Sequence, residues 1–419
     1  MRICIHRGTQ EIGGSCVEVS AAGKRILLDL GMPLELKDNE VPSLPRVAGL
    51  AEPDDELLGV VLSHPHQDHW GLIPLMRNEV PVFLGRAAER ILREAAFFRA
   101  GDFNPRVGGY LQDRKPLQVG PFRITPFLND HSAFDSYSLL VEAGDKSVFY
   151  TGDFRAHGRK KSLYDRLIQN SPESVDVLLT EGTSVSPDGQ HQGQGPSEVQ
   201  VERDLIRLFR EASGPVLVAM SAQNIDRVVS VYRACLQSSR TLVVDLYAAA
   251  IAKATGRSTI PQPGFPNYKV WVPHPQRVRV KNKAEFQRVE EIRPIRVYPG
   301  RDFARIANRS VFLFRESMAR EFEKAGCLEN GLLVWSLWAG YLVPPHGEGT
   351  RSFVARNGLK QVYCHSSGHA GIEDIQRLVH ALQPGKVVPM HTFGAAQFQQ
   401  ILSGIAPVQQ HADGQWWNV

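Results

Sequence analysis

Three histidines and an aspartate, in the pattern His64-x-His66-x-Asp68-His69, lie directly after an apolar run at residues 57–62. The apolar run is typical of a buried strand, so these side chains are expected in the loop at its end. Imidazole and carboxylate groups are ligands that borderline divalent metals such as Zn²⁺ prefer. His64 and His66 alternate and can point toward one ion, whereas Asp68 and His69 belong to the next turn and can reach a second. A polar surface loop with chance histidines is the alternative, and this dense spacing makes it the weaker interpretation.

Further candidate ligands follow other predicted strands. His131 comes after residues 122–127, Asp153 comes after residues 147–150, and His391 closes the last apolar run of the chain. A single histidine after a strand is more often structural than a ligand. The three positions together with the first cluster nevertheless favour a site for two metal ions.

The cysteines and the apolar content exclude several other classes of protein. The 5 cysteines are scattered and form no CxxC pair, so neither a disulfide scaffold nor a thiolate zinc finger is expected. No apolar run approaches the ~20 residues that a membrane helix needs, and the first residues do not resemble a signal peptide. A net charge of +4 is too small to indicate nucleic-acid binding by itself. We therefore expect a cytoplasmic protein without a membrane segment.

The predicted elements change character near the middle of the chain. The first half reads as short strands separated by loops, with a helix at about residues 71–76. Residues 184–196 are polar and rich in Gly, Gln, Pro and Ser, which is typical of a loop or domain boundary. Helices and strands then alternate as in a parallel α/β domain. From residue 361 a strand, a helix and another strand return, so the α/β part is expected to interrupt the first domain.

Three features leave more than one interpretation open. Basic residues concentrate between positions 277 and 301, where they either contact a nucleic-acid backbone or form a solvated strand face. Trp335 and Trp338 can stack on bases, but packing in the core is favoured for both. Cys364 is next to His365, and packing is again favoured over a reactive thiol.

The order of the candidate ligands resembles that of the metallo-β-lactamase fold in its dinuclear form. Asp29, in an apolar segment that ends in Leu30-Gly31, matches the motif that supports the metal loop of that fold. The resemblance implies a cofactor of two Zn²⁺ ions, with Mn²⁺ left open because it also binds nitrogen and oxygen ligands. It implies one ion on His64, His66 and His131, the other on Asp68, His69 and His391, and Asp153 as the bridge.

Further segments resemble the β-CASP nucleases, and among them the ribonucleases J. They are Leu178-Leu179-Thr180-Glu181-Gly182-Thr183, His365-Ser366-Ser367-Gly368-His369, Val388-Pro389-Met390-His391 and residues 335–342. The resemblance implies an α/β fold, an αββα metallo-β-lactamase sandwich with an inserted parallel α/β β-CASP domain. The expected boundaries are 1–187 and 353–419 for the metallo-β-lactamase domain and 188–352 for the β-CASP domain. The additional C-terminal domain of ribonuclease J is expected to be missing.

The same resemblance implies a zinc-dependent ribonuclease, in which a hydroxide activated by two metal ions attacks RNA phosphodiester bonds. Asp68 would be catalytic as well as a ligand. His369, oriented by Glu181, would contact the phosphate or donate a proton to the leaving oxygen. A terminal 5′-phosphate would be bound by His365, Ser367 and Gly368. This implies 5′-to-3′ exonuclease action, with endonuclease action left open.

Single-stranded RNA is the partner that the resemblance implies, with 5′-monophosphorylated RNA among the candidates. RNA-directed β-CASP enzymes carry His in the closing motif, as at His391, whereas DNA-directed members commonly carry Val. A DNA nuclease of this family, or a small-molecule hydrolase of the same fold, is the alternative. The inserted α/β domain with its basic stretch argues against a small substrate. A homodimer is left open.

Overall fold

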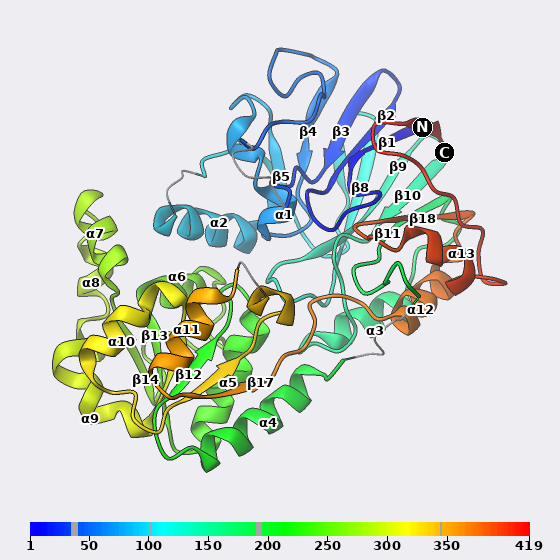
Figure 1. Cartoon of the computed structure of the whole chain (residues 1–419). Helices are drawn as coiled ribbons and strands as arrows, with labels where there is room; N and C mark the ends of the chain where they lie inside the picture. The colour runs from blue at the N-terminus through cyan, green and yellow to red at the C-terminus, as the bar shows by residue number, and fades with distance from the viewer. Residues whose placement is uncertain (35–40, 100–102, 190–194, 344–345) are drawn as a thin grey trace. The chain divides into compact units, whose positions relative to one another are not determined.

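The computed structural model describes residues 1–34, 41–99, 103–189, 195–343 and 346–419 (Figure 1). The chain divides into two compact units: Met1–Arg93, Gly101–Gly195 and Gly368–Val419 form the first, and Glu94–Ala100 and Pro196–Ser367 form the second. The domain boundaries expected from the sequence, at 187/188 and 352/353, stay a prediction. None of the described helices is long and apolar enough to cross a membrane.

The first unit contains two mixed sheets. One has the strand order β19-β1-β2-β3-β4-β5-β6 and the other the order β18-β11-β10-β9-β8-β7. The strands of the first are β1 (Arg2–Arg7), β2 (Cys16–Ala21), β3 (Lys24–Leu28), β4 (Leu57–Val61), β5 (Val82–Gly85), β6 (Val107–Leu111) and β19 (Trp416–Asn418). Those of the second are β7 (Leu117–Val119), β8 (Phe122–Leu128), β9 (Tyr137–Ala143), β10 (Lys146–Tyr150), β11 (Val177–Glu181) and β18 (Lys386–Met390). The strands β10, β11 and β18 run parallel, so their carboxyl ends meet at one edge.

The two sheets share one hydrophobic core. Ile3, Val17 and Leu28 of the first sheet cluster with Leu139 and Val388 of the second, and all five are fully buried. The opposite face of the second sheet is covered by α3 (Lys161–Gln169), α12 (Ile372–Leu382) and α13 (Phe398–Ile401). Apolar residues spaced three and four apart give α12 the face that it buries. The α/β sandwich expected from the sequence is confirmed.

The second unit is built on a six-stranded sheet with the order β14-β13-β15-β12-β16-β17, in which every neighbouring pair is parallel. The strands are β12 (Val216–Ala219), β13 (Thr241–Asp245), β14 (Tyr268–Trp271), β15 (Ser310–Phe314), β16 (Leu332–Trp335) and β17 (Lys360–Tyr363). One face packs on α4 (Glu198–Glu211), α5 (Ile225–Gln237) and α6 (Leu246–Ala254). The other packs on α10 (Ala319–Ala325) and α11 (Glu348–Arg356). Helices on both faces are what a parallel sheet requires, and the parallel α/β prediction is confirmed.

The helix predicted at residues 71–76 is wrong in its position. The structure has α1 at Gln67–Trp70 and a separate 3₁₀ turn at Ile73–Leu75. The helix therefore begins inside the histidine motif and ends at Gly71, because Pro74 cannot continue a helix from the preceding turn.

The basic stretch is helical, so its interpretation as a strand face is wrong. It covers α7 (His274–Asn282) and α8 (Gln287–Glu290). Two of its arginines bind the short segment Glu94–Ala100 of the same unit: Arg288 pairs with Glu94 at 2.6 Å, and Arg279 donates to the carbonyl of Phe97 at 2.6 Å. Part of this charge is therefore used inside the unit.

The two tryptophans differ in how much of their side chain is exposed. Trp335 is 5% exposed in the core of the second unit, as predicted, whereas Trp338 is 63% exposed, so core packing was the wrong prediction for it. All five cysteines are buried, and burial raises the pKa of the Cys364 thiol to about 11. The prediction that Cys364 is a packing residue is confirmed.

Candidate metal centre

The first four predicted ligands lie in the loop after β4 and in α1. His66 stands just before α1 with an extended backbone, Asp68 lies in the first turn of the helix, and His69 lies in its last turn. A carboxylate in the first turn is favoured by the positive end of the helix dipole. His64 and His69 are almost completely buried, at 0% and 1% exposure. These two histidines therefore face the interior of the first unit, whereas His66 and Asp68 are only partly buried.

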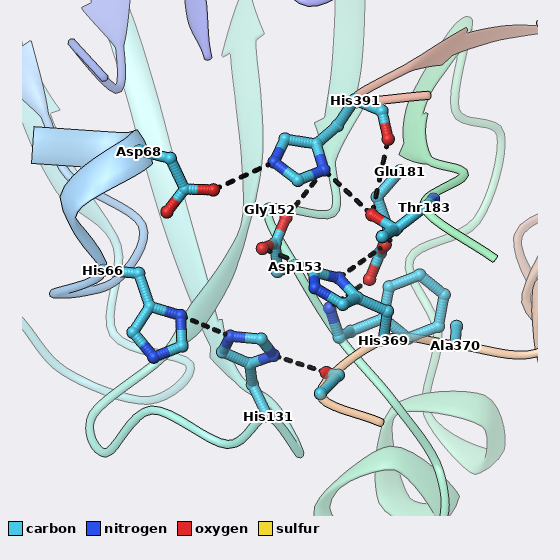
Figure 2. A network of polar contacts seen from close by, with 12 residues as sticks. His66, Asp68, His131, Gly152, Asp153, Glu181, Thr183, His369, Ala370 and His391 are labelled. Atoms are coloured by element: carbon cyan, nitrogen blue, oxygen red, sulfur yellow. Dashed lines mark hydrogen bonds and ion pairs between the residues drawn. The ribbon is translucent and has the colours of Figure 1, made fainter. Parts of the chain in front are cut away.

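The remaining predicted ligands converge on this motif from the second sheet (Figure 2). His131 follows β8, Asp153 follows β10 and His391 follows β18. Their ligand atoms form two overlapping groups in which all atoms lie within 4.8 Å of one another. The groups are His64, His66, His131 and Asp153, and Asp68, His69, Asp153 and His391. Asp153 belongs to both, so the structure brings all seven predicted ligands together.

Four of the candidate-ligand histidines each have their imidazole ring oriented by a hydrogen bond from Nδ1. His69 donates to Asp29 Oδ2 at 2.7 Å, and His131 donates to the carbonyl of Gly368 at 2.7 Å. The other two use hydroxyl groups: His64 with Ser63 Oγ at 3.0 Å, and His391 with Thr183 Oγ1 at 2.9 Å. A proton on Nδ1 leaves the Nε2 lone pair free to face the cluster.

Buried polar atoms in the cluster show that the donor set fits a divalent metal ion. His64 Nε2, His69 Nε2 and Asp153 Oδ1 are buried and have no hydrogen-bond partner among the described residues. His66 Nδ1 and His131 Nε2 lie only 3.1 Å apart, although both are ligand-type atoms. Buried polar groups without partners are costly, and a cation between these lone pairs would satisfy them.

The histidines of the cluster differ in the direction in which their pKa values are shifted. Burial lowers the pKa of His64 and of His131 well below the usual value, and it lowers the pKa of His66 to about 4. These three rings are therefore neutral at physiological pH, which is the form that binds a metal. For His69, burial acts in the same direction, but the carboxylates of Asp153, Asp29 and Asp68 outweigh it and raise the pKa.

Asp29 links the two sheets beneath the cluster. Its Oδ2 accepts hydrogen bonds from His69 Nδ1, from Ser63 Oγ at 2.7 Å and from the Tyr150 hydroxyl at 2.6 Å. Its Oδ1 accepts from the Ser63 backbone N–H at 2.7 Å. The residue is fully buried and has φ 61, a left-handed conformation that Asp and Asn tolerate better than most residues. Asp29 therefore supports the motif, in the position that the sequence predicted for it.

His369 and Glu181 form a pair beside the two ligand groups (Figure 2). His369 Nδ1 donates to Glu181 Oε2 at 2.9 Å, and Glu181 Oε1 accepts from the backbone N–H of Phe154 at 2.9 Å. Burial opposes the charged ring, but Glu181 and Asp153 raise the pKa of His369 to about 9. Its side chain is 23% exposed, so part of the ring is open to solvent.

A third group of ligand atoms is less suited to a metal. It consists of Asp153, Glu181, His369 and His391. Both carboxylate oxygens of Glu181 and the Nδ1 of His369 are already engaged in hydrogen bonds. This arrangement suits a positioned imidazole better than a third cation.

The three predicted 5′-phosphate contacts are divided between the units. His365 and Ser367 belong to the second unit, and Gly368 begins the last part of the first. His365 Nδ1 lies 3.1 Å from the Ser336 carbonyl, within its own unit. Gly368 lies against Ser132 and presents its carbonyl to His131. The assignment of these three residues to a 5′-phosphate site stays a prediction.

Sequence reasoning missed several partners of the ligands. Thr183 orients His391, and Tyr150 binds Asp29 across the sandwich. Thr183 stands inside the acidic segment that resembled a nuclease motif, so that segment carried a signal for it. Tyr150 ends an ordinary apolar strand and offered none.

Comparison with a protein-family model identifies a β-lactamase superfamily domain at residues 25–220. Ribonuclease J of Mycolicibacterium smegmatis is 24% identical over 415 residues, which cover 93% of this chain and 68% of that protein. Ribonuclease J of Mycoplasma genitalium is 21% identical over 95% of this chain and 68% of its own length. Ribonuclease J of Helicobacter pylori strain 26695 is 25% identical over 57% of this chain and 35% of its own length.

Similarity to a solved structure supports the fold and nothing further. A protein of unknown function from Enterococcus faecalis V583 matches with a TM-score of 0.78 and 21% sequence identity, over 99% of both chains. The superfamily domain and the histidine–aspartate cluster together indicate the use of a divalent metal. The relatives extend over both units, so the resemblance stated from the motifs is confirmed. The chain therefore resembles the ribonucleases J over nearly its whole length, and residues 25–220 match a β-lactamase superfamily domain.

Proposed function

We propose that this protein is a ribonuclease that hydrolyses phosphodiester bonds of RNA with the help of two Zn²⁺ ions. The observation that carries the proposal is the pair of four-ligand groups that share Asp153, buried in one unit of the fold. The proposal is supported by relatives that are ribonucleases J and match 93% to 95% of the chain.

The candidate ligands fall into two sets, one for each proposed ion. One ion would be held by His64, His66 and His131 and the other by Asp68, His69 and His391, with Asp153 between them. When bound, two such ions lower the pKa of a water molecule and neutralise the charge of a phosphodiester. Two carboxylates against two divalent ions leave a positive surplus at the site, which favours an anionic substrate. The protein supplies this surplus without a large net charge of its own.

His369 is placed to handle the proton of the leaving group. Its Nδ1–H is held by Glu181, which fixes the ring, and we assign Nε2 the role of donating a proton to the departing oxygen. Glu181 is itself held by the Phe154 backbone N–H and remains an acceptor for Nδ1. Glu181 is thus a positioning residue, and His369 is the group that meets the substrate.

The finer features of the activity are part of the same proposal. His391 favours RNA over DNA, and His365, Ser367 and Gly368 are proposed to hold a 5′-monophosphate, which favours 5′-to-3′ exonuclease action. We propose a cytoplasmic location because all five thiols are buried and unpaired, as in proteins of reducing compartments.

Hydrolysis of RNA with defined 5′ ends tests the proposal. The wild type, Asp68→Ala and His369→Ala are each incubated with 5′-monophosphate, 5′-triphosphate and 5′-hydroxyl RNA and with DNA of the same sequence. The metal content of each preparation is measured. His380→Ala, a change at an exposed histidine in the last turn of α12, is the matched control.

We expect the wild type and His380→Ala to cut RNA, and His369→Ala to lose about 10²- to 10⁴-fold in rate with its metal retained. Chelator should abolish cutting, and returned Zn²⁺ or Mn²⁺ should identify the ion that restores it. A metal-loaded wild type that cuts none of the substrates contradicts the nuclease proposal. Equal cutting of DNA contradicts the preference for RNA, and products released from within the chain contradict exonuclease action.

A further inference from the structure

Two neighbouring strands of the second unit end together at one edge of its sheet. β16 and β17 are parallel, and Trp335 pairs in register with Tyr363. The segments that follow are tied to each other: Ser336 Oγ donates to the carbonyl of Cys364 at 2.5 Å, and His365 Nδ1 lies 3.1 Å from the carbonyl of Ser336. The carboxyl edge of a parallel sheet is where α/β proteins commonly bind ligands.

Three large aromatic side chains are exposed at this edge. Trp338 is 63% exposed, Tyr363 is 53% exposed and Tyr341 is 47% exposed. Trp338 and Tyr341 meet edge to face with ring centroids 5.5 Å apart, and Tyr363 lies 6.0 Å from the ring of His365. Large aromatic side chains are usually buried for most of their surface, so their exposure here is informative. We call these three side chains the aromatic surface.

The indole of Trp338 is held in place although it is exposed. The Nε1–H of the buried Trp335 donates to the carbonyl of Trp338 at 3.2 Å, which fixes the backbone. A Cβ atom at Gly340 would lie 2.0 Å from the Trp338 ring, so the indole lies against the glycine and only a glycine leaves room for it. A ring fixed in this way loses little freedom when a ligand stacks on it.

We propose that the aromatic surface binds nucleobases of single-stranded RNA by stacking. The inference rests on the proposed ribonuclease activity and adds a binding site for bases to it. Every base has a π-face, so exposed rings bind RNA without requiring a particular sequence. The surface is continuous with His365, the proposed contact of the 5′-phosphate, through the ring contact with Tyr363. The nearby Val343 is also exposed, at 59%, so a contact with another protein is the alternative outcome that the test must distinguish.

Binding of RNA with and without bases tests this site. A 5′-monophosphorylated, phosphorothioate-linked RNA that resists hydrolysis is compared with an abasic RNA of equal length and charge. The dissociation constants are measured for the metal-loaded wild type, Trp338→Ala, Trp338→Phe and Gly340→Ala. Leu236→Ala, at another exposed apolar side chain of the same unit, is the matched control. Hydrolysis of ordinary RNA by the wild type is measured in parallel.

We expect Trp338→Ala to bind base-bearing RNA about 5- to 100-fold more weakly than the wild type. Gly340→Ala should behave similarly because it displaces the indole without removing it, whereas Trp338→Phe and Leu236→Ala should stay close to the wild type. All five proteins should bind abasic RNA equally.

Equal binding of base-bearing RNA by the wild type and Trp338→Ala would overturn the inference. So would an equal loss on both RNAs, which would assign Trp338 to folding, or a loss of self-association without a change in RNA affinity, which would assign the surface to a protein contact. A wild type that binds bases but hydrolyses no RNA contradicts the ribonuclease proposal and leaves the stacking site standing.

Discussion

Replacing Asp29 by Asn changes the support of the metal centre with little change in shape. Asn has nearly the same volume, and it tolerates the left-handed backbone of φ 61 that would strain Ala at this position. Asp29 donates no hydrogen bond and accepts four, of which two come from Ser63 and one each from His69 and Tyr150. Asn has only one carbonyl oxygen, so its amide N–H₂ must face at least one of these donors.

Both orientations of the new amide carry a cost. If the carbonyl takes the place of Oδ2, the N–H₂ faces the Ser63 backbone N–H, and a buried donor without an acceptor costs about 1–3 kcal/mol. If the amide is reversed, its N–H₂ faces His69 Nδ1, and the ring proton must move to Nε2. Because Nε2 is the atom directed at the cluster, that tautomer cannot bind a metal. Changes of this kind next to a metal ligand lower the affinity for the metal by about 10- to 100-fold.

Competition with a chromophoric chelator measures this affinity directly, and the rate of RNA hydrolysis is followed as the metal concentration rises. We expect Asp29→Asn to need about 10- to 100-fold more metal for half-maximal activity and to approach the wild-type rate at saturation. Asp135→Asn is the matched control, because Asp135 has φ 63 and accepts from two backbone N–H groups and the Tyr137 hydroxyl, but is not bonded to a candidate ligand. Unchanged metal affinity in Asp29→Asn, or an equal loss in Asp135→Asn, would refute the reasoning.

Three further outcomes follow from other parts of the molecule. Chelation of the metal should lower the melting temperature in a thermal scan. A free ion concentration of 100 times the dissociation constant adds about 2.7 kcal/mol to the free energy of unfolding. Arg227→Met leaves the fully buried Glu198 carboxylate without its 2.8 Å partner and should cost about 3–5 kcal/mol in urea unfolding, whereas Arg233→Met, at an exposed pair, should cost under about 1 kcal/mol. Burial alone would raise the pKa of Asp176, but hydrogen bonds and charge from Lys146 and Ser147 outweigh it and lower the pKa. This stabilisation is present above the usual pKa and is lost as the pH falls through the lowered one, so Asp176→Asn should flatten the acid side of a stability–pH curve.

The ligands could be predicted because their signal is local. A buried strand followed by His64-x-His66-x-Asp68-His69 combines apolar periodicity with ligand-type residues, and both are visible in a few residues of sequence. The parallel sheet of the second unit could be predicted for the same reason, since alternating helices and strands have a repeating pattern. The exact start of α1 could not, because the motif itself supplies the first turn and no cap residue marks it.

What escaped prediction depends on residues that are far apart in the chain. Tyr150 and Asp29 are separated by 121 positions, and Thr183 and His391 by 208, so no local pattern joins them. The exposure of Trp338 has the same origin. Trp335 and Trp338 are equally apolar in sequence, and only the packing of β16 against its neighbours buries the first and leaves the second outside.

The arrangement of the metal centre couples ion binding to the stability of the first unit. Its ligands come from α1 and from the loops after β4, β8, β10 and β18, so the cluster forms only when both sheets are assembled. Asp29 and His391 adopt left-handed backbone angles there, with φ 61 and φ 52, a conformation that is unfavourable for residues other than glycine. His64 Nε2, His69 Nε2 and Asp153 Oδ1 are also buried without hydrogen-bond partners among the described residues. These costs are offset only when a cation joins the ligands, and the unfolded chain cannot offer such a site. The free energy of metal binding therefore contributes directly to folding of the sandwich.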